Sequence, residues 1–328
     1  MLRRLFGAVT GSAIASLALI LAFTAPVLAG LGQPTDGNLG LQLPATSIRS
    51  ESSSLFDTVN AIIVAITVFV LLLMLYVMFR FKESSNPTPS RTTHNTALEV
   101  AWTIIPIMIL VVVAIPSFKL LYEQYRFPKP DITIKATANA WFWDHEYMDQ
   151  GVTISSNVVR DEDVLKAKLG GDKPFNEQFS KYPEGLARIK AMHEAAVPVW
   201  AELKQPRMLT VDQEIALPVG KVVHVLVTSN DVIHSWTIPS FGVKQQAVPG
   251  RTAAVWFQPD KTGVFYGQCS VLCGKSHSAM PIVIRVVEQA VYDAWMEAVK
   301  AKDMKKAKSV LTADAASGKA SQSVAAAQ

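Results

Sequence analysis

Two long apolar segments limit most strongly what this chain of 328 residues can fold into. Residues 56–79 and 97–122 each hold about twenty apolar or small residues, enough to cross a hydrocarbon core of about 30 Å as a helix. The alternative is a pair of buried helices in a water-soluble protein. The pattern favours the membrane, and it predicts transmembrane helices over residues 56–82 and 97–122.

The link between these helices, residues 83–96, decides their orientation. Arg80, Lys82 and Arg91 lie in or beside this short link, and short loops rich in Arg and Lys stay in the cytoplasm. Both ends of the mature chain, including residues 30–55, would then lie outside. We expect a two-pass protein of a bacterial inner membrane, in contact with lipid, with the rest of the chain on the periplasmic side.

Residues 1–29 have the pattern of an export signal. Arg3 and Arg4 precede a short apolar stretch, and Val27 and Ala29 stand at positions −3 and −1 of a cleavage site. The alternative is an uncleaved first membrane helix, but the apolar stretch is too short to span a bilayer comfortably. We therefore predict a cleaved signal peptide.

The part of the chain after the second apolar segment is predicted to be mainly β. Turn-forming residues separate short segments rich in β-branched and aromatic residues, as in a sandwich or barrel. These segments are 131–147, 222–229, 252–259, 263–269 and 281–287. Residues 161–205 are charged and carry Ala, Leu and Lys at helical spacing, which predicts a helical insertion.

The two segments that follow this domain give weaker signals. Residues 289–312 are predicted to form one amphipathic helix, and residues 313–328, rich in Ala, Ser and Gln, a disordered tail. The domain itself, residues 123–288, carries equal numbers of basic and acidic side chains. This balance gives no indication of nucleic-acid binding, which would call for a strongly basic patch.

Both cysteines of the chain lie within five positions, in the sequence QCSVLCGKSHSAM (268–280). A disulfide between Cys269 and Cys273 would be ordinary in an exported protein, but it leaves His277 and Met280 unexplained. Two thiolates, an imidazole and a thioether favour copper over zinc. A mononuclear blue-copper site uses one cysteine, so two indicate a pair of coppers bridged by sulfur, each with its own imidazole.

The second imidazole has to come from elsewhere, and the chain holds six histidines. His94 lies in the link between the membrane helices and His193 in the helical insertion. His145 and His224 lie in strand patterns, where a half-buried or solvent-facing side chain is the usual case. His234, just past a strand and followed by a turn, is the best-placed candidate.

Five motifs together closely resemble subunit II of the haem–copper cytochrome c oxidases. They are TSNDVIHSWTIPSFGVK, AVPGR, FYGQCSVLCGKSHSAMPIVIRVV, AWFWDHEY and LEVAWTIIP. The resemblance covers the membrane helices and the strand framework, but not the signal, the insertion or the tail. It implies a membrane-anchored, cupredoxin-like Greek-key β-sandwich behind a transmembrane hairpin.

The resemblance also implies the function. The chain would be the oxidoreductase subunit that takes electrons from reduced cytochrome c at a binuclear copper A centre. It would pass them to haem in subunit I, where oxygen is reduced and protons are pumped; further oxidase subunits would complete the assembly.

The ligand set follows from the same resemblance: bridging Cys269 and Cys273, terminal His234 and His277, axial Met280, and the backbone carbonyl of Val271. Val271 stands where the family normally has Glu, whose carboxylate also helps hold a magnesium ion against subunit I. A valine keeps the carbonyl and loses the carboxylate. Copper binding would survive, and the magnesium site is in doubt.

Further residues match family positions with other roles. Trp141 matches the aromatic residue where electrons enter, although an ordinary core tryptophan is the alternative. Glu99 matches the glutamate at the cytoplasmic mouth of a proton channel, although an acid near a helix end can also snorkel to the interface. Asp144, Glu146 and Asp149 could steer a basic cytochrome c, and a solvated strand end explains them equally well.

Two other functions stay open. A quinol oxidase subunit II shares this fold and topology but lacks the copper ligands. A membrane-anchored copper chaperone or store would need neither the AWFWDHEY element nor Glu99.

Overall fold

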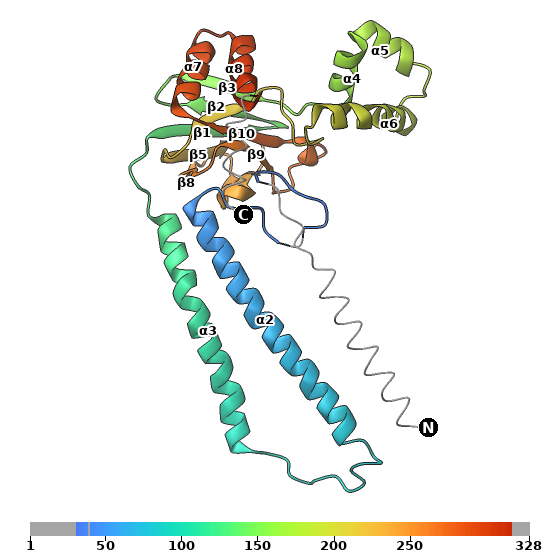
Figure 1. Cartoon of the computed structure of the whole chain (residues 1–328), viewed down its shortest axis with the longest axis vertical. Coiled ribbons are helices and arrows are strands. Elements are labelled where there is room, and N and C mark those ends of the chain that lie inside the picture. Colours follow the sequence, from blue (N-terminus) through green and yellow to red (C-terminus); the bar gives the residue numbers. More distant parts are fainter. Residues whose placement is uncertain (1–30, 39, 317–328) are drawn as a thin grey trace.

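The computed structural model describes residues 31–38 and 40–316. A β-rich domain lies at one end of the molecule and two long helices extend away from it (Figure 1). The predicted signal peptide lies outside the described residues, as does the predicted tail from residue 317 onward.

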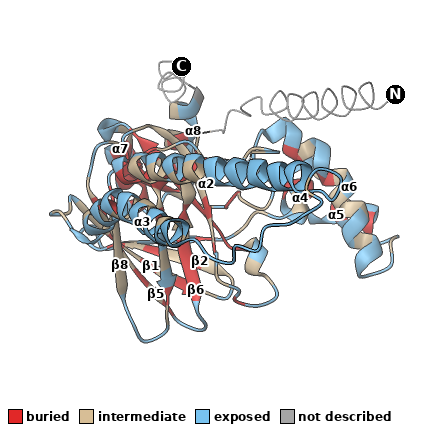
Figure 2. Cartoon of the chain, turned by 90° about the horizontal axis from the view of Figure 1, so that it is seen from below, coloured by how far each residue is buried: buried red, intermediate tan, exposed pale blue. Residues whose placement is uncertain are grey.

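The two long helices are α2 (Ser47–Arg80) and α3 (Thr96–Tyr125). In the described part of the chain they are the two helices long and apolar enough to cross a membrane. Their apolar side chains are exposed, and both helices carry the exposed colour along nearly their whole length in Figure 2. An exposed apolar surface of this extent is compatible with lipid or a membrane partner, not with water.

Helix α2 begins nine residues before the predicted span 56–82. Its N-cap is Thr46, whose side chain accepts a hydrogen bond from the backbone N–H of Arg49 at 3.1 Å. The same hydroxyl donates to the carbonyl of Phe241 at 2.9 Å. A helix of 34 residues is about 51 Å long, which exceeds a hydrocarbon core of about 30 Å. Its polar first turns can therefore lie outside the membrane, where Thr46 joins the helix to the β-domain.

The β-domain contains ten strands in the described residues, arranged in three sheets. The strands are β1 Ile132–Asn139, β2 Phe142–Tyr147, β3 Val152–Ser156, β4 Ile215–Pro218, β5 Val223–Ser229, β6 His234–Ile238, β7 Val243–Ala247, β8 Ala253–Phe257, β9 Gly263–Gln268 and β10 Pro281–Val287. The sheet orders are β3-β2-β1-β5-β8, β4-β10-β9 and β6-β7. The pairs β1–β5 and β4–β10 are parallel, and the other pairs are antiparallel.

Side chains alternate between the core and the surface along these strands. In β2 the residues Trp143, His145 and Tyr147 face inward, and in β5 alternate residues from Val223 onward do the same. The predicted single segment 131–147 is two strands, since it turns back at residues 140–141.

Strands β3, β4, β6 and β7 were not predicted. The first two are only five and four residues long, β6 and β7 flank a turn of 3-10 helix, η1 (Pro239–Phe241), and β7 is largely polar. Segments this short and mixed give no clear period-2 signal.

The predicted helical insertion is present as α4 (Asp161–Leu169), α5 (Asp172–Phe179) and α6 (Leu186–Leu203). Figure 1 shows these helices standing at the side of the sandwich. They bury a small core of their own, composed of Val164, Leu165, Phe175, Phe179, Ala196 and Trp200. At the base of the insertion the N–H of Val159 donates to the carbonyl of Thr210 at 2.9 Å.

The single helix predicted over residues 289–312 is in fact two, α7 (Gln289–Lys300) and α8 (Met304–Ala316). Lys302 adopts a left-handed conformation with φ of 57°, which ends the first helix. The carboxylate of Asp303 then accepts a hydrogen bond from the N–H of Lys306 at 2.9 Å and caps the second. Helix α8 also continues past residue 313, where the tail was predicted to begin.

Candidate metal centre

The cysteine-containing loop, residues 269–280, joins the adjacent antiparallel strands β9 and β10. The two ends of the loop are held together because the N–H of Cys269 donates to the carbonyl of Met280 at 3.1 Å. A single turn of 3-10 helix, η2 (His277–Ala279), leads back to β10. Strand pairing therefore places the first cysteine and the methionine side by side, although they are eleven positions apart.

The two thiols face each other, with Cys269 Sγ and Cys273 Sγ 3.8 Å apart. Both cysteines are free, so this structure does not contain the disulfide considered as an alternative. Two thiolates at this separation subtend about 110° at an ion about 2.3 Å from each, which is close to the tetrahedral angle. The sulfur pair therefore fits a shared metal.

Each thiol has its own imidazole. His234 Nδ1 lies 3.9 Å from Cys269 Sγ, and His277 Nδ1 lies 3.5 Å from Cys273 Sγ. Within the described residues, the ligand atoms of His234, Cys269 and Cys273 lie within 4.8 Å of one another, and His277 extends the group beyond the second thiol. The four side chains therefore follow one another in space in the order imidazole, thiol, thiol, imidazole.

The remaining predicted ligands, Val271 and Met280, belong to the same loop. The carbonyl oxygen of Val271 is 3.3 Å from Cys269 Sγ. Met280, at the end of the loop, is fully buried. The side chain of Val271 is half-buried and carries no group that could bind a second cation.

Burial makes this cluster a poor place for unpaired negative charge. His234 is 0% exposed, and both thiols are buried. Burial, and after it the neighbouring sulfur of Cys269, raise the pKa of the Cys273 thiol to about 12. A bound cation would offset both effects, so the pair needs metal to exist as two thiolates.

Asp231 is a site residue that the sequence reasoning missed. Its carboxylate lies 2.7 Å from His234 Nε2, which turns the other ring nitrogen toward Cys269. Burial raises the pKa of Asp231, but hydrogen bonds from His234, Val232 and Ser229 outweigh it and hold the pKa below its usual value. The spacing of three residues between Asp231 and His234 was the available signal.

A close approach of strands β6 and β9 brings the loop to His234. A Cβ atom on Gly267 would lie 2.1 Å from the carbonyl oxygen of Thr237, so only glycine fits there. Ser270 continues the contact beyond the strand, with its hydroxyl 3.0 Å from that of Ser235 and 2.9 Å from that of Thr237.

Trp141 lies directly against the loop. Its Nε1–H donates to the carbonyl of Cys273 at 3.1 Å, and Lys275 Nζ lies 5.6 Å from the ring centroid. A Cβ atom on Gly274 would lie 3.0 Å from the ring. Trp141 is half-buried, whereas Trp143 is fully buried, so Trp141 connects the surface with the cysteine loop.

The three predicted docking acids are spread along β2. Asp144 accepts hydrogen bonds from Asn139 Nδ2 at 2.9 Å and from the hydroxyl of Ser155. Asp149 lies beyond the opposite end of the strand from Trp141 and accepts from a backbone N–H. Glu146 faces outward between them and is half-buried.

A second set of charged residues, absent from the sequence predictions, lies closer to the tryptophan. Trp141 shares a surface hollow with Arg160, Glu162, Asp163 and Asp212. The first three of these charged residues belong to the base and the first turn of the insertion. Only the chain fold brings them next to a tryptophan that is some twenty residues earlier.

Glu99 lies at the other end of the molecule, in the first turn of α3. It is half-buried, and its carboxylate makes no ion pair within the described residues. Asn95 caps this helix by accepting a hydrogen bond from the N–H of Leu98 at 3.2 Å.

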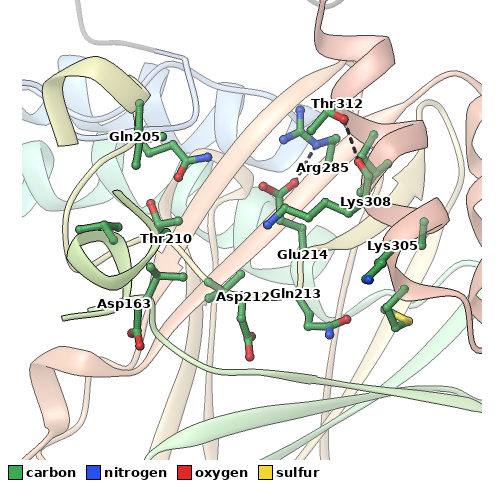
Figure 3. A pocket seen from close by; sticks show the side chains of 18 of the residues that line it. Asp163, Gln205, Thr210, Asp212, Gln213, Glu214, Arg285, Lys305, Lys308 and Thr312 are labelled. Atoms are coloured by element: carbon green, nitrogen blue, oxygen red, sulfur yellow. Dashed lines mark hydrogen bonds and ion pairs between the residues drawn. The ribbon is translucent and has the colours of Figure 1, made fainter. Parts of the chain in front are cut away.

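A separate cavity lies between the insertion and helix α8 (Figure 3). It measures about 730 Å³, and Arg285 and Glu214 form an ion pair of 2.7 Å in its wall. The cysteine loop contributes nothing to its lining, so this cavity is separate from the metal centre.

Comparison with known proteins agrees with this architecture. The family "Cytochrome C oxidase subunit II, periplasmic domain" matches residues 192–287, and "Cytochrome C oxidase subunit II, transmembrane domain" matches residues 34–120. Cytochrome c oxidase subunit 2 of Cereibacter sphaeroides is 39% identical over 293 residues, covering 89% of this chain and 90% of the relative. The chain belongs to the cytochrome c oxidase subunit II family.

A plant protein and a solved bacterial domain are also similar to this chain. Cytochrome c oxidase subunit 2 of Arabidopsis thaliana is 35% identical over 265 residues, covering 79% of this chain and 88% of the relative. The crystal structure of the periplasmic domain of subunit II of cytochrome oxidase from Bradyrhizobium japonicum is 39% identical. It covers 54% of this chain and 99% of that domain, with a TM-score of 0.40.

Family membership confirms the predicted fold class, a membrane-anchored chain with two apolar helices before a cupredoxin-like sandwich that carries a helical insertion. It also identifies the chain as a subunit of an oxidoreductase of the haem–copper oxidase type.

Proposed function

We propose that this subunit II receives electrons from a reduced cytochrome c at a pair of copper ions and delivers them to haem in subunit I. One observation carries the proposal: His234, Cys269, Cys273 and His277 follow one another in space at 3.9, 3.8 and 3.5 Å. Held there, two coppers would share one electron through the sulfur bridges.

The protein contributes a rigid and dry setting for that pair. Cys269 and Cys273 would act as bridges and His234 and His277 as terminal ligands, with the carbonyl of Val271 and the thioether of Met280 as weak axial ligands. Asp231 fixes the ring of His234, and the paired ends of the loop keep the ligands in place before metal arrives. A preorganised, buried ligand set changes little between oxidation states, which favours fast electron transfer.

Trp141 is the proposed entry point for electrons. Its half-buried ring can meet a partner at the surface, while its Nε1–H donates to the carbonyl of the bridging residue Cys273. Asp144, Glu146 and Asp149 are proposed to steer the approach of a basic cytochrome c. Glu99, at the far end of α3, is proposed to stand at the mouth of a proton path into subunit I.

The proposed setting is a bacterial inner membrane with the β-domain and both chain ends on the periplasmic side. The basic link Arg80 to Arg91 supports this orientation. We further propose that a magnesium site against subunit I is weakened or built from other residues. Val271 retains the carbonyl for copper and supplies no carboxylate.

Copper loading of the purified full-length chain in detergent tests the proposal. Two coppers per chain and a purple mixed-valence spectrum are expected. One copper per chain, or a blue single-copper spectrum, would contradict the binuclear assignment. A quinol oxidase subunit II would bind none, and a copper store would lose its metal quickly to a chelator.

Trp141→Phe tests the entry point in the assembled oxidase. Electron entry from cytochrome c should slow while the copper spectrum and cytochrome binding stay nearly unchanged, because the change affects electronic coupling alone. Loss of copper or of folding in this variant would show that Trp141 is a core residue instead.

A further inference from the structure

His145 lies in the core of the β-domain, directly behind the candidate metal centre. The strand pattern predicted a half-buried or exposed side chain, but His145 is only 1% exposed because β2 turns this position inward. Its neighbours are Trp143 on the same strand and Trp236 on β6. The proposed electron path uses none of these three side chains.

A hydrogen bond joins His145 to the strand of the copper ligand. The Nε1–H of Trp236 donates to His145 Nε2 at 3.3 Å. Trp236 is two residues after His234 on β6, and β6 belongs to a different sheet from β2. This side-chain bond therefore ties the ligand strand to a sheet with which it shares no backbone ladder.

A second contact reaches the ligand itself. The ring of Trp143 neighbours both histidines, and its centroid lies 6.4 Å from that of His145 and 6.3 Å from that of His234. The Trp143 ring meets the His234 ring edge-on at 65°. His145 therefore contacts two groups next to His234: Trp236, which lies on the same strand as His234, and the ring of Trp143, which packs against the His234 ring.

The polar character of His145 is costly for the core. Because Nε2 accepts a hydrogen bond, the proton of the neutral ring is on Nδ1, which has no partner among the described residues. The Nε1 of Trp143 is unpartnered as well. An apolar side chain would avoid the unpaired ring nitrogen, so a buried polar group of this kind points to a role.

We propose that His145 is a positioning residue for the copper ligand His234. Through Trp236 and Trp143 it sets where β6 and the imidazole of His234 stand relative to Cys269. The inference rests on the proposed function, because it takes His234 as a copper ligand. Burial lowers the pKa of His145 to about 3, so the ring remains a neutral acceptor in ordinary buffers.

Two substitutions at this position separate positioning from packing. His145→Leu removes the acceptor, and His145→Gln keeps an acceptor close to the position of Nε2. The full-length chain in detergent is loaded with copper, and its paramagnetic resonance spectrum and its rate of copper release to a chelator are measured. Release from the Leu variant should be roughly 10-fold faster with an altered spectrum, and the Gln variant should stay within roughly twofold of the unmodified chain.

His224→Leu is the matched control. His224 is a strand histidine of the same five-stranded sheet, bonded to the carbonyl of Pro128 at 2.8 Å and without a contact to the cysteine loop. This variant should leave the copper spectrum and the release rate unchanged.

Three results would overturn the proposal: an unchanged spectrum and release rate in His145→Leu, failure of His145→Gln to restore them, or an equal effect of His224→Leu. If His145→Leu does not fold, Trp236→Phe decides, because it removes the donor and keeps an aromatic ring; normal copper binding there would equally reject the proposal. If the unmodified chain binds no copper pair, the proposed function itself fails, and this outcome is distinct.

Discussion

The cysteine loop and the helical insertion are both closed at their base by strand-like hydrogen bonds, but they are stabilised in different ways. The loop is closed between Cys269 and Met280, and the insertion between Val159 and Thr210. The side chains of the loop join the main core of the sandwich. The insertion buries six residues in a separate core.

The difference follows from length. A loop of twelve residues cannot bury enough apolar surface by itself to offset the entropy lost when it becomes ordered. Its ordered conformation therefore depends on packing against the surrounding strands. An insertion of three helices can bury a core of its own. The metal centre should therefore respond to changes throughout the sandwich, whereas the insertion should behave as a nearly independent unit.

Replacing a bridging thiol should have the largest effect. Cys269→Ser or Cys273→Ser should abolish the copper pair, because each change removes one bridging sulfur and leaves the other without a shared cation. In Cys269→Ser the remaining sulfur is that of Cys273, whose pKa is raised by burial. Copper content and the visible spectrum check this. Ser270→Ala, within the same loop, should retain both coppers; loss of copper there would show that any change in the loop is fatal.

Truncation in the insertion should be large but local. Trp200→Ala removes a buried ring and its hydrogen bond to Asp161 at 2.9 Å, and should cost about 3–5 kcal/mol in the stability of helices α4–α6. Hydrogen exchange should accelerate in those helices, with the copper spectrum unchanged.

Phe265→Ala is the matched change in the sandwich core, where Phe265 is 0% exposed. It should speed hydrogen exchange across the sandwich and weaken copper retention together. If the Trp200 variant loses copper as readily, the insertion and the metal centre are one cooperative unit and the comparison fails.

The buried histidine predicts that the stability of the sandwich depends on pH. Burial lowers the pKa of His145 to about 3, whereas an unfolded histidine titrates near 6.5, so below that pH the unfolded chain binds the extra proton. The free energy of unfolding should fall by about 1.4 kcal/mol per pH unit from about 6.5 down to about 3, and should be unaffected above 6.5.

Urea titrations of the copper-free chain, followed by tryptophan fluorescence at pH 7 and 5, test this. The unmodified chain should lose roughly 2 kcal/mol more than His145→Leu over this interval. Parallel curves for the two proteins would mean that His145 does not titrate as its burial requires.

The smallest effect is expected at the axial sulfur. Met280→Leu conserves volume in a fully buried position and should cost less than about 1.5 kcal/mol in stability. Both coppers should remain bound, with a shifted reduction potential, because an axial thioether tunes a copper site more than it holds it. Loss of one copper would make Met280 a principal ligand.

The sequence was sufficient where the decisive property is local. The length and apolarity of residues 56–79 and 97–122 predict the membrane helices without any tertiary information. Four candidate ligands lie within twelve positions, namely Cys269, Cys273, His277 and Met280. Their sulfur and nitrogen donors can therefore be recognised as a metal-binding motif in the sequence.

The sequence was insufficient where partners are distant or where a turn changes direction. The break at residues 301–303 depends on one left-handed residue and the cap at Asp303, which a helical pattern over 289–312 does not reveal. The inward direction of His145 depends on the register of β2 against β1. Propensity alone gives neither.

The sequence by itself therefore determined that this chain is anchored in a membrane and carries a soft-metal loop, because apolar length and ligand spacing act over short distances. Only the tertiary structure decided that Asp231 and His145 support His234 and that the first turn of the insertion stands beside Trp141. Those contacts join residues through strand pairing and core packing across many positions, and no local pattern encodes which sheet will face which.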